Sequence, residues 1–335
     1  MANNTVNIKS RINDRRIKEN FIEKQHVSTE ILQTLDDMRI THMYENYLHK
    51  NIQDYPTPIE FHITEVAHIT NKISLPQIWR FEGFKGLNSN SLSWWSLKIN
   101  DADIQEAEER YLETKFPDRS KEERAAQQPF LRKFTTSPLF KDESRYGNFR
   151  FTFPLSELME AYKKQKCEGE EPVLRIYETK LFKQEIEYVV LVHSPQFNEK
   201  FKDFPLLTSN PIVAYDGQQI IWKAQAICET HTLELETIGN MAVTQRKERY
   251  EHYVWDQVSL AFHTNEVLTF SKKRLKASLS ACQRDQYVNL DKWKNTYVHK
   301  DISLEEAEKI IENLQDDEPE EEKEDKKEEI KMEDE

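Results

Sequence analysis

The sequence predicts a mixed α+β fold in which helices flank a curved, mostly antiparallel sheet. Several segments alternate apolar and polar residues with the period of a strand, and others repeat apolar residues at helical spacing. The chain of 335 residues also contains 17 Phe, 13 Tyr and 6 Trp, which are enough large apolar side chains to build a core. Together these observations favour one α+β core domain over residues 51–300.

Five segments carry the strand pattern. The clearest is SLSWWSLKI at 91–99, and the segment from residue 59 to 65 alternates in the same way. An Asp216-Gly217 dipeptide indicates a hairpin, because glycine accepts the positive φ that tight hairpin turns require. Residues 253–263 fit either a strand or a helix. The predicted strands are 59–65, 91–99, 149–153, 173–194 and 212–236.

Helices are predicted where apolar stripes follow capping residues. Asn100 or Asp101 can cap the segment that follows it, and Ser303 with Glu306 forms the spacing of a capping box. Val66, Ile69 and Ile73 have helical spacing and predict one or two further short helices. The predicted helices of the core are 101–116, 155–164 and 270–284, and an amphipathic helix follows at 301–315.

The two ends of the chain differ from the core in composition. Residues 1–50 are polar and mildly basic, and the spacing of their apolar residues predicts a helical N-terminal arm. Residues 316–335 hold 13 acidic residues and four lysines, a net charge of −9, which leaves −4 of the total of −13 for the rest of the chain. A segment of this composition cannot bury enough apolar surface to order itself, so we expect a disordered acidic tail.

Several classes of protein are disfavoured by what the sequence lacks. It contains no apolar run of about 18 residues, no apolar segment typical of a signal peptide, and neither a GxGxxG nor a GxxxxGK[ST] motif. Cys167, Cys228 and Cys282 form no CxxC pair, so we expect no metal site. Their small, odd number fits a reducing compartment, and we expect a cytoplasmic or nuclear protein that does not contact a membrane.

The strand at 185–193, EIEYVVLVH, begins with two acidic residues. Glu185 and Glu187 fall on one face of it, and both faces become apolar after Tyr188, as in a central strand that is covered on both sides. Two carboxylates at the entrance of such a strand need a cation, a hydroxyl or a ligand. One interpretation is a functional pair, and the other is a strand end at the surface with Lys180 or Lys183 as the counter-charge.

The segment EFHITEV at 60–66 is the second candidate for a site. His62 shares a strand face with Glu60 and Thr64, and a segment with spaced isoleucines and a Gly-Phe turn at 83–84 follows. A single histidine on a strand is more often a hydrogen-bonded structural residue than a reactive one.

Taken together, His62-Ile63-Thr64, the Gly-Phe turn and the late Glu185-Ile186-Glu187 strand resemble the ADP-ribosyltransferase fold over residues 59–197. The resemblance implies that His62 and Thr64 contact NAD. It also implies that Glu187, assisted by Glu185, stabilises the oxocarbenium-like transition state of the ribose. For the middle element of the family the candidates are Tyr146 in the nicotinamide pocket and Ser93 or Ser96.

Two functions follow from these patterns. The first is a protein-interaction or regulatory module without catalysis, favoured by the missing cofactor motif, the charged surface and the acidic tail. The second is an NAD-dependent, ADP-ribosyltransferase-like enzyme that transfers ADP-ribose to a protein or nucleic-acid acceptor. The core has a charge near zero and the tail is acidic, so we expect a protein partner rather than nucleic acid.

Overall fold

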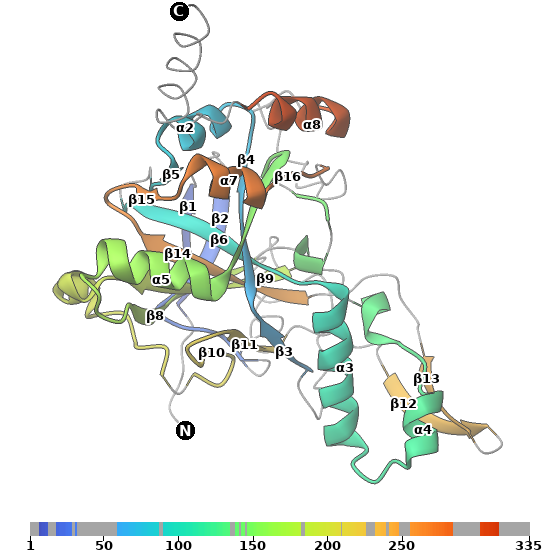
Figure 1. Cartoon of the computed structure of the whole chain (residues 1–335). Helices are drawn as coiled ribbons and strands as arrows, with labels where there is room; N and C mark the ends of the chain where they lie inside the picture. The colour runs from blue at the N-terminus through green and yellow to red at the C-terminus, as the bar shows by residue number, and fades with distance from the viewer. Residues whose placement is uncertain are drawn as a thin grey trace, which may run out of the picture.

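The computed structural model has a mixed α+β fold, as the sequence predicts. It describes residues 7–12, 18–28, 31, 59–86, 90–134, 138–140, 142–144, 146–181, 185–208, 210–225, 232–238, 241–247, 255–283 and 302–314. The elements within these residues surround a central sheet of nine strands (Figure 1).

The central sheet has the strand order β1-β2-β8-β9-β14-β6-β4-β7-β16. All its neighbouring pairs are antiparallel except β9 and β14, which run parallel. β14 therefore joins two antiparallel groups of four strands, one on each of its sides. The strands are β1 Lys9–Ile12, β2 Lys18–Glu23, β4 Glu65–Thr70, β6 Leu92–Lys98, β7 Phe149–Pro154, β8 Val173–Leu181, β9 Glu185–His193, β14 Trp255–His263 and β16 Leu279–Ala281.

Three smaller antiparallel sheets accompany it. The largest has the order β10-β11-β3, and the other two are pairs, β12 with β13 and β5 with β15. The Asp216-Gly217 dipeptide lies in the turn between β10 and β11, and Gly217 has the positive φ that its position requires. Their bounds are β3 Ile59–Ile63, β5 Gly83–Phe84, β10 Val213–Tyr215, β11 Ile220–Ala224, β12 Thr232–Ile238, β13 Met241–Lys247 and β15 Leu268–Thr269.

Two helices begin at the predicted caps. Asn100 forms a capping box with Asp103 at the start of α3, and the Ser303 side chain accepts a hydrogen bond from the Glu306 backbone at the start of α8. In Figure 1, α2 and α8 lie at one end of the molecule and α3 and α4 at the other. The helices are α2 Leu75–Arg80, α3 Asp101–Lys115, α4 Lys121–Ala126, α5 Leu155–Lys166, α6 Asn198–Phe201, α7 Lys272–Ser278 and α8 Leu304–Glu312, with 3₁₀ turns η1 Leu131–Phe134, η2 Pro138–Phe140 and η3 Pro195–Phe197.

The two faces of the central sheet are covered differently. Alternate residues of β9 from Ile186 to Val192 belong to the main hydrophobic core, which includes residues of α3, α5 and α7. Val189 and Leu191 point to the opposite face and join a smaller apolar cluster with Phe201 of α6. β9 is thus a central strand that is covered on both sides, as its sequence predicts. The second face is the one that carries the polar residues described below.

Four sequence-based expectations need correction or completion. Of the predicted helix 270–284, only Lys272–Ser278 is α-helical, and Leu279–Ala281 form strand β16. The helical arm is wrong for residues 9–12 and 18–23, which form the hairpin β1–β2, and nearly all of the remaining arm lies outside the described residues. The helical spacing from Val66 instead belongs to strand β4, because Val66 packs in the core while Ile69 points to the other face. The ambiguous segment 253–263 contains strand β14.

The acidic tail at 316–335 lies outside the described residues. Among the helices that the structure describes, none has both the length and the apolar composition needed to span a membrane.

Candidate functional site

The polar centre of the second sheet face is an ion pair between neighbouring strands. Lys180 of β8 lies directly opposite Glu187 of β9, and their side-chain nitrogen and oxygen are 3.5 Å apart. Lys180 is 8% exposed and Glu187 is 4% exposed, so both charges are largely removed from water. Burial acts to lower the pKa of Lys180, but the carboxylates of Glu187, Glu19 and Glu178 hold it above the ordinary lysine value. Lys180 is therefore a fixed cation and a poor nucleophile.

The N-terminal hairpin completes this charged cluster. Arg11 of β1 donates two hydrogen bonds to the two carboxylate oxygens of Glu178, at 2.7 and 2.5 Å, and a third to Glu19 at 3.0 Å. Glu178 is only 1% exposed, so this bidentate pair replaces the water that its carboxylate loses. Residues 9–12 are thus tied to the sheet by charge as well as by strand pairing.

An aromatic ring covers the same lysine. The Lys180 ammonium lies 4.2 Å from the ring centre of Trp94, which reaches it from β6. Tyr146 is close enough to act on the charge of Lys180. Lys180 therefore lies between carboxylates and the Trp94 ring, and it forms an ion pair with Oε2 of Glu187, a buried oxygen that accepts no hydrogen bond from the described residues.

Next to this pair, the sheet face has a hollow of about 50 Å³. Gln257 of β14 is paired in register with Glu187 and lines the hollow. Most of the other lining groups are polar side chains from β6, β7 and the segment 142–146. The polar lining residues are Ser96, Lys98, Glu143, Ser144, Tyr146, Arg150 and Gln257.

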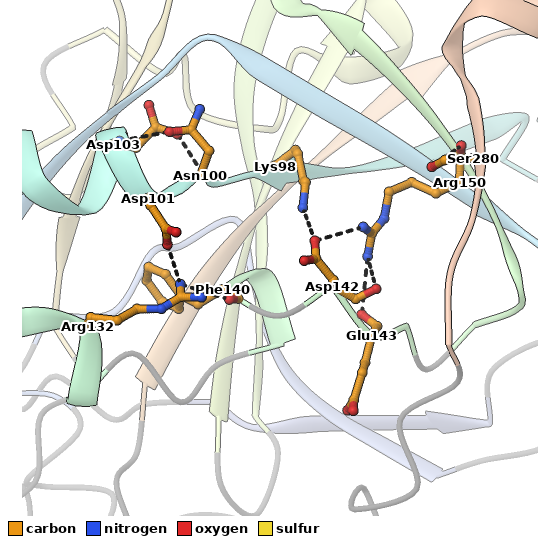
Figure 2. A network of polar contacts seen from close by, with 10 residues as sticks. All are labelled: Lys98, Asn100, Asp101, Asp103, Arg132, Phe140, Asp142, Glu143, Arg150 and Ser280. Atoms are coloured by element: carbon orange, nitrogen blue, oxygen red, sulfur yellow. Dashed lines mark hydrogen bonds and ion pairs between the residues drawn. The ribbon is translucent and has the colours of Figure 1, made fainter. Parts of the chain in front are cut away.

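Asp142 neutralises both cations of the hollow. One of its carboxylate oxygens accepts a hydrogen bond from Lys98 at 2.8 Å and lies 3.5 Å from Arg150, as Figure 2 shows. Arg150 also donates to the backbone carbonyls of Asp142 and Glu143, at 2.9 and 3.3 Å. The hydrogen bond from Lys98 lowers the pKa of Asp142 below its usual range. The two cations are held in place while the acid that joins them belongs to an exposed loop.

The loop is fixed by its contacts with β4 and with residues just after β16. A Cβ on Gly147 would lie 2.0 Å from the carbonyl oxygen of Thr70, so only glycine fits here. Asn148 donates its side-chain amide to the carbonyl of Cys282, and the Ser144 amide donates to the carbonyl of Gln283. These contacts set the position of Tyr146, whose own amide donates to the Ser144 hydroxyl at 3.1 Å.

The first-strand candidates lie on the small sheet. His62 of β3 contacts Glu60 through Nε2 at 2.7 Å, and the Gln219 amide reaches its Nδ1 at 3.4 Å, which together favour the Nε2-protonated tautomer. Burial acts to raise the pKa of Glu60, but the bonds from His62 and Lys223 bring it below the ordinary value. The Thr64 side chain is exposed, and its carbonyl accepts the Leu155 amide at the start of α5.

The structure therefore brings some of the predicted residues together and not others. Glu187 pairs with Lys180, Tyr146 acts on the charge of the same lysine, and Tyr146 and Ser96 both line the adjoining hollow. His62 and Thr64 belong to a different group of contacts on another strand, and none of the described interactions joins His62 to Glu187. Glu185 opens β9 opposite Trp255, but its side chain lies outside the described part of the chain.

One of the two interpretations of the sequence is a strand end at the surface with Lys180 or Lys183 as the counter-charge; in the structure Lys180 is the counter-charge of Glu187, but both side chains are buried. It missed Lys98, Arg150 and Gln257, which share the sheet face only through strand pairing. The one signal that could have suggested them is alternation within β6 and β7, where Lys98 and Arg150 interrupt otherwise apolar strands.

Buried histidines lie on the second sheet face where β9 and β14 end. His193 accepts a hydrogen bond from Arg175 at 2.8 Å, and Nε2 of His263 lies 3.0 Å from the Lys200 ammonium. Burial lowers the pKa of His193, and burial together with Lys200 lowers that of His263 to about 4. At neutral pH both rings are therefore uncharged.

No group of three or more His, Cys, Asp or Glu side chains that could hold a metal ion occurs in the described ranges. Comparison of the chain with protein-family models, with curated proteins and with solved structures finds no match.

Proposed function

We propose that the chain is a non-catalytic module that binds a protein partner. The observation that supports this best is the state of Glu187, the residue that the ADP-ribosyltransferase resemblance places at the reaction centre. Lys180 already neutralises this carboxylate within the sheet face. A carboxylate that stabilises a developing positive charge has to face the substrate, and an adjacent fixed cation opposes that role.

The size of the hollow supports the same proposal. Sites for cofactors and drug-sized ligands enclose about 300–1,000 Å³, whereas this hollow has about 50 Å³. A dinucleotide does not fit a space of that size, but one side chain of a partner does. The Tyr146 ring lines the hollow and is 39% exposed, so it offers an aromatic contact of the kind that is enriched at interfaces.

The enzyme alternative rests on Glu187 and Tyr146, which both act on the charge of Lys180, and a direct test separates the two functions. If the chain is non-catalytic, NAD leaves the melting temperature of the wild type unchanged, and labelled NAD leaves no label on the protein. A rise in melting temperature that His62→Ala abolishes would contradict this proposal. So would labelling that Glu187→Gln removes while the circular dichroism spectrum stays the same.

The acidic segment 316–335 gives a second test of the interaction function. We expect that deleting it leaves the urea midpoint unchanged, because the segment is too polar to contribute to the core. The deletion should also weaken capture of the partner, since a net charge of −9 favours docking on a basic surface. Quantitative pull-downs with full-length and shortened protein measure this, and equal capture by both would argue against a role for the tail.

A further inference from the structure

We propose that the hollow beside Glu187 binds a single carboxylate group of a partner polypeptide, which competes with the exposed Asp142 for the two cations that line the hollow. This assignment deepens the interaction function and rests on it. It assigns the recognition to Lys98, Arg150 and Gln257, and it names the ligand as an acidic side chain or a chain-terminal carboxylate.

The first step is the arrangement of the two cations. Arg150 is buried, and its guanidinium is held by two backbone carbonyls, so it loses little freedom when it binds an anion. Lys98 reaches the same Asp142 oxygen from the neighbouring part of the sheet (Figure 2). Two cations that converge on one carboxylate form a binding arrangement for that group.

The second step is the exposure of Asp142. Its side chain is 94% exposed, whereas the side chains of Lys98 and Arg150 are 20% and 9% exposed. Ion pairs made by an exposed acid contribute little, because water competes for both partners. A carboxylate from a partner can therefore replace Asp142 at small cost, and the cations remain paired during the exchange.

Gln257 is an independent indication of a ligand. It lines the hollow from a third strand, β14, and is only 5% exposed. Its side-chain amide carries hydrogen-bond donors that an anion in the hollow can use, in addition to the two cations. A carboxylate between Lys98 and Arg150 would accept a hydrogen bond from this amide.

Charge and size favour a carboxylate over a phosphate. Glu143 lines the hollow beside the two cations, and Asp142 pairs with both of them; these two acids repel a dianion more strongly than a monoanion. A volume of about 50 Å³ holds one small planar group.

The test uses the full chain and three probes: the peptide Ac-Gly-Glu-Gly-NH₂, its uncharged match Ac-Gly-Gln-Gly-NH₂, and inorganic phosphate. Binding is measured by NMR titration, and folding is checked by thermal melting. We expect the Glu peptide to bind, with neither of the other probes reaching the same affinity. Lys98→Met should weaken binding of the Glu peptide at least about tenfold, while Lys98→Arg retains it.

Asp142→Asn gives the most specific result, because it removes the internal competitor. It should tighten binding of the Glu peptide about two- to fivefold. The matched control Lys309→Met removes an exposed lysine on α8 that pairs with Glu305, and it should change nothing. Equal binding of the Glu and Gln peptides, preference for phosphate, or unchanged or weaker binding in Asp142→Asn would overturn the proposal.

The interaction function and the carboxylate site can fail independently of each other. Partner capture that survives Lys98→Met, combined with no binding of the Glu peptide, overturns the carboxylate site and leaves the interaction module intact. Binding of the Glu peptide that follows the expected order of variants supports the site, even where no partner is captured and the broader function fails.

Discussion

Lys180→Met should lower the free energy of unfolding by about 3–5 kcal/mol at neutral pH, because it leaves the buried Glu187 carboxylate without its cation. The double variant Lys180→Met/Glu187→Met should recover most of this loss, since two apolar side chains of similar volume replace a desolvated pair at little cost. Urea unfolding of the wild type, both single variants and the double variant gives the complete cycle.

A matched control for this cycle is the exposed pair of Lys163 with Glu171. Lys163→Met should leave the free energy of unfolding nearly unchanged, because water screens that pair. The raised pKa of Lys180 fixes the pH range of the experiment. The stabilisation from the charged lysine is complete below its ordinary value of about 10.4 and is lost as the pH rises past the higher value in the fold. A double variant no more stable than Lys180→Met would refute the buried-pair argument.

The protein should also lose most of its stability between pH 6.5 and pH 4. Burial lowers the pKa values of His26, His68 and His263 from 6.5 to about 4, so in this range the unfolded chain binds protons that the folded chain does not. A fall of that size corresponds to about 3 kcal/mol for a buried histidine. Several such groups together approach the total of about 5–15 kcal/mol that stabilises a typical domain.

The variant that isolates one of these groups is His26→Gln. The buried His26 ring donates through Nε2 to the carbonyl of Val189 at 3.0 Å, and a glutamine amide can keep such a bond without titrating. The stability of His26→Gln should therefore fall less steeply than that of the wild type as the pH drops from 6.5 to 4. Urea midpoints at pH 8, 6 and 4.5 measure this, with pH 8 as the reference for any packing cost. Parallel curves would exclude His26 as a cause of acid unfolding.

The fold class and most central strands could be predicted, because a strand with one buried face alternates apolar and polar residues along the sequence. The strands β6, β7 and β9 follow the alternation of their sequences. The hairpin β1–β2 could not be predicted, because Lys9 pairs with Glu23 and Arg11 with Glu19, and charged cross-strand pairs leave no apolar pattern. In β4, apolar residues on both faces imitated a helix.

The candidate site could be predicted only in part, for a related reason. The position of Glu187 at the entrance of a buried strand was visible in the sequence, and so was the need for a counter-charge. The residues on either side of Glu187 depend on the register of β8, β9 and β14. This register places Lys180 on one side of Glu187 and Gln257 on the other. The packing of the loop around Gly147 against Thr70, which sets Tyr146 beside them, is a tertiary contact without a local signal.

The position of β14 in the central sheet has a consequence for the order of folding. One group of four strands ends at β9 and the other at β6, and both gain their shared neighbour only through residues 255–263. During synthesis β1, β2, β8 and β9 can pair before β14 is made, and so can β6, β4 and β7, whereas β16 follows β14 in the chain. Gln257, which lines the hollow next to Glu187, is added only with β14. Contacts so distant in sequence form slowly. A ribosome-bound chain that ends before Trp255 therefore exposes two unprotected sheet edges, to which a chaperone or a second nascent chain can bind.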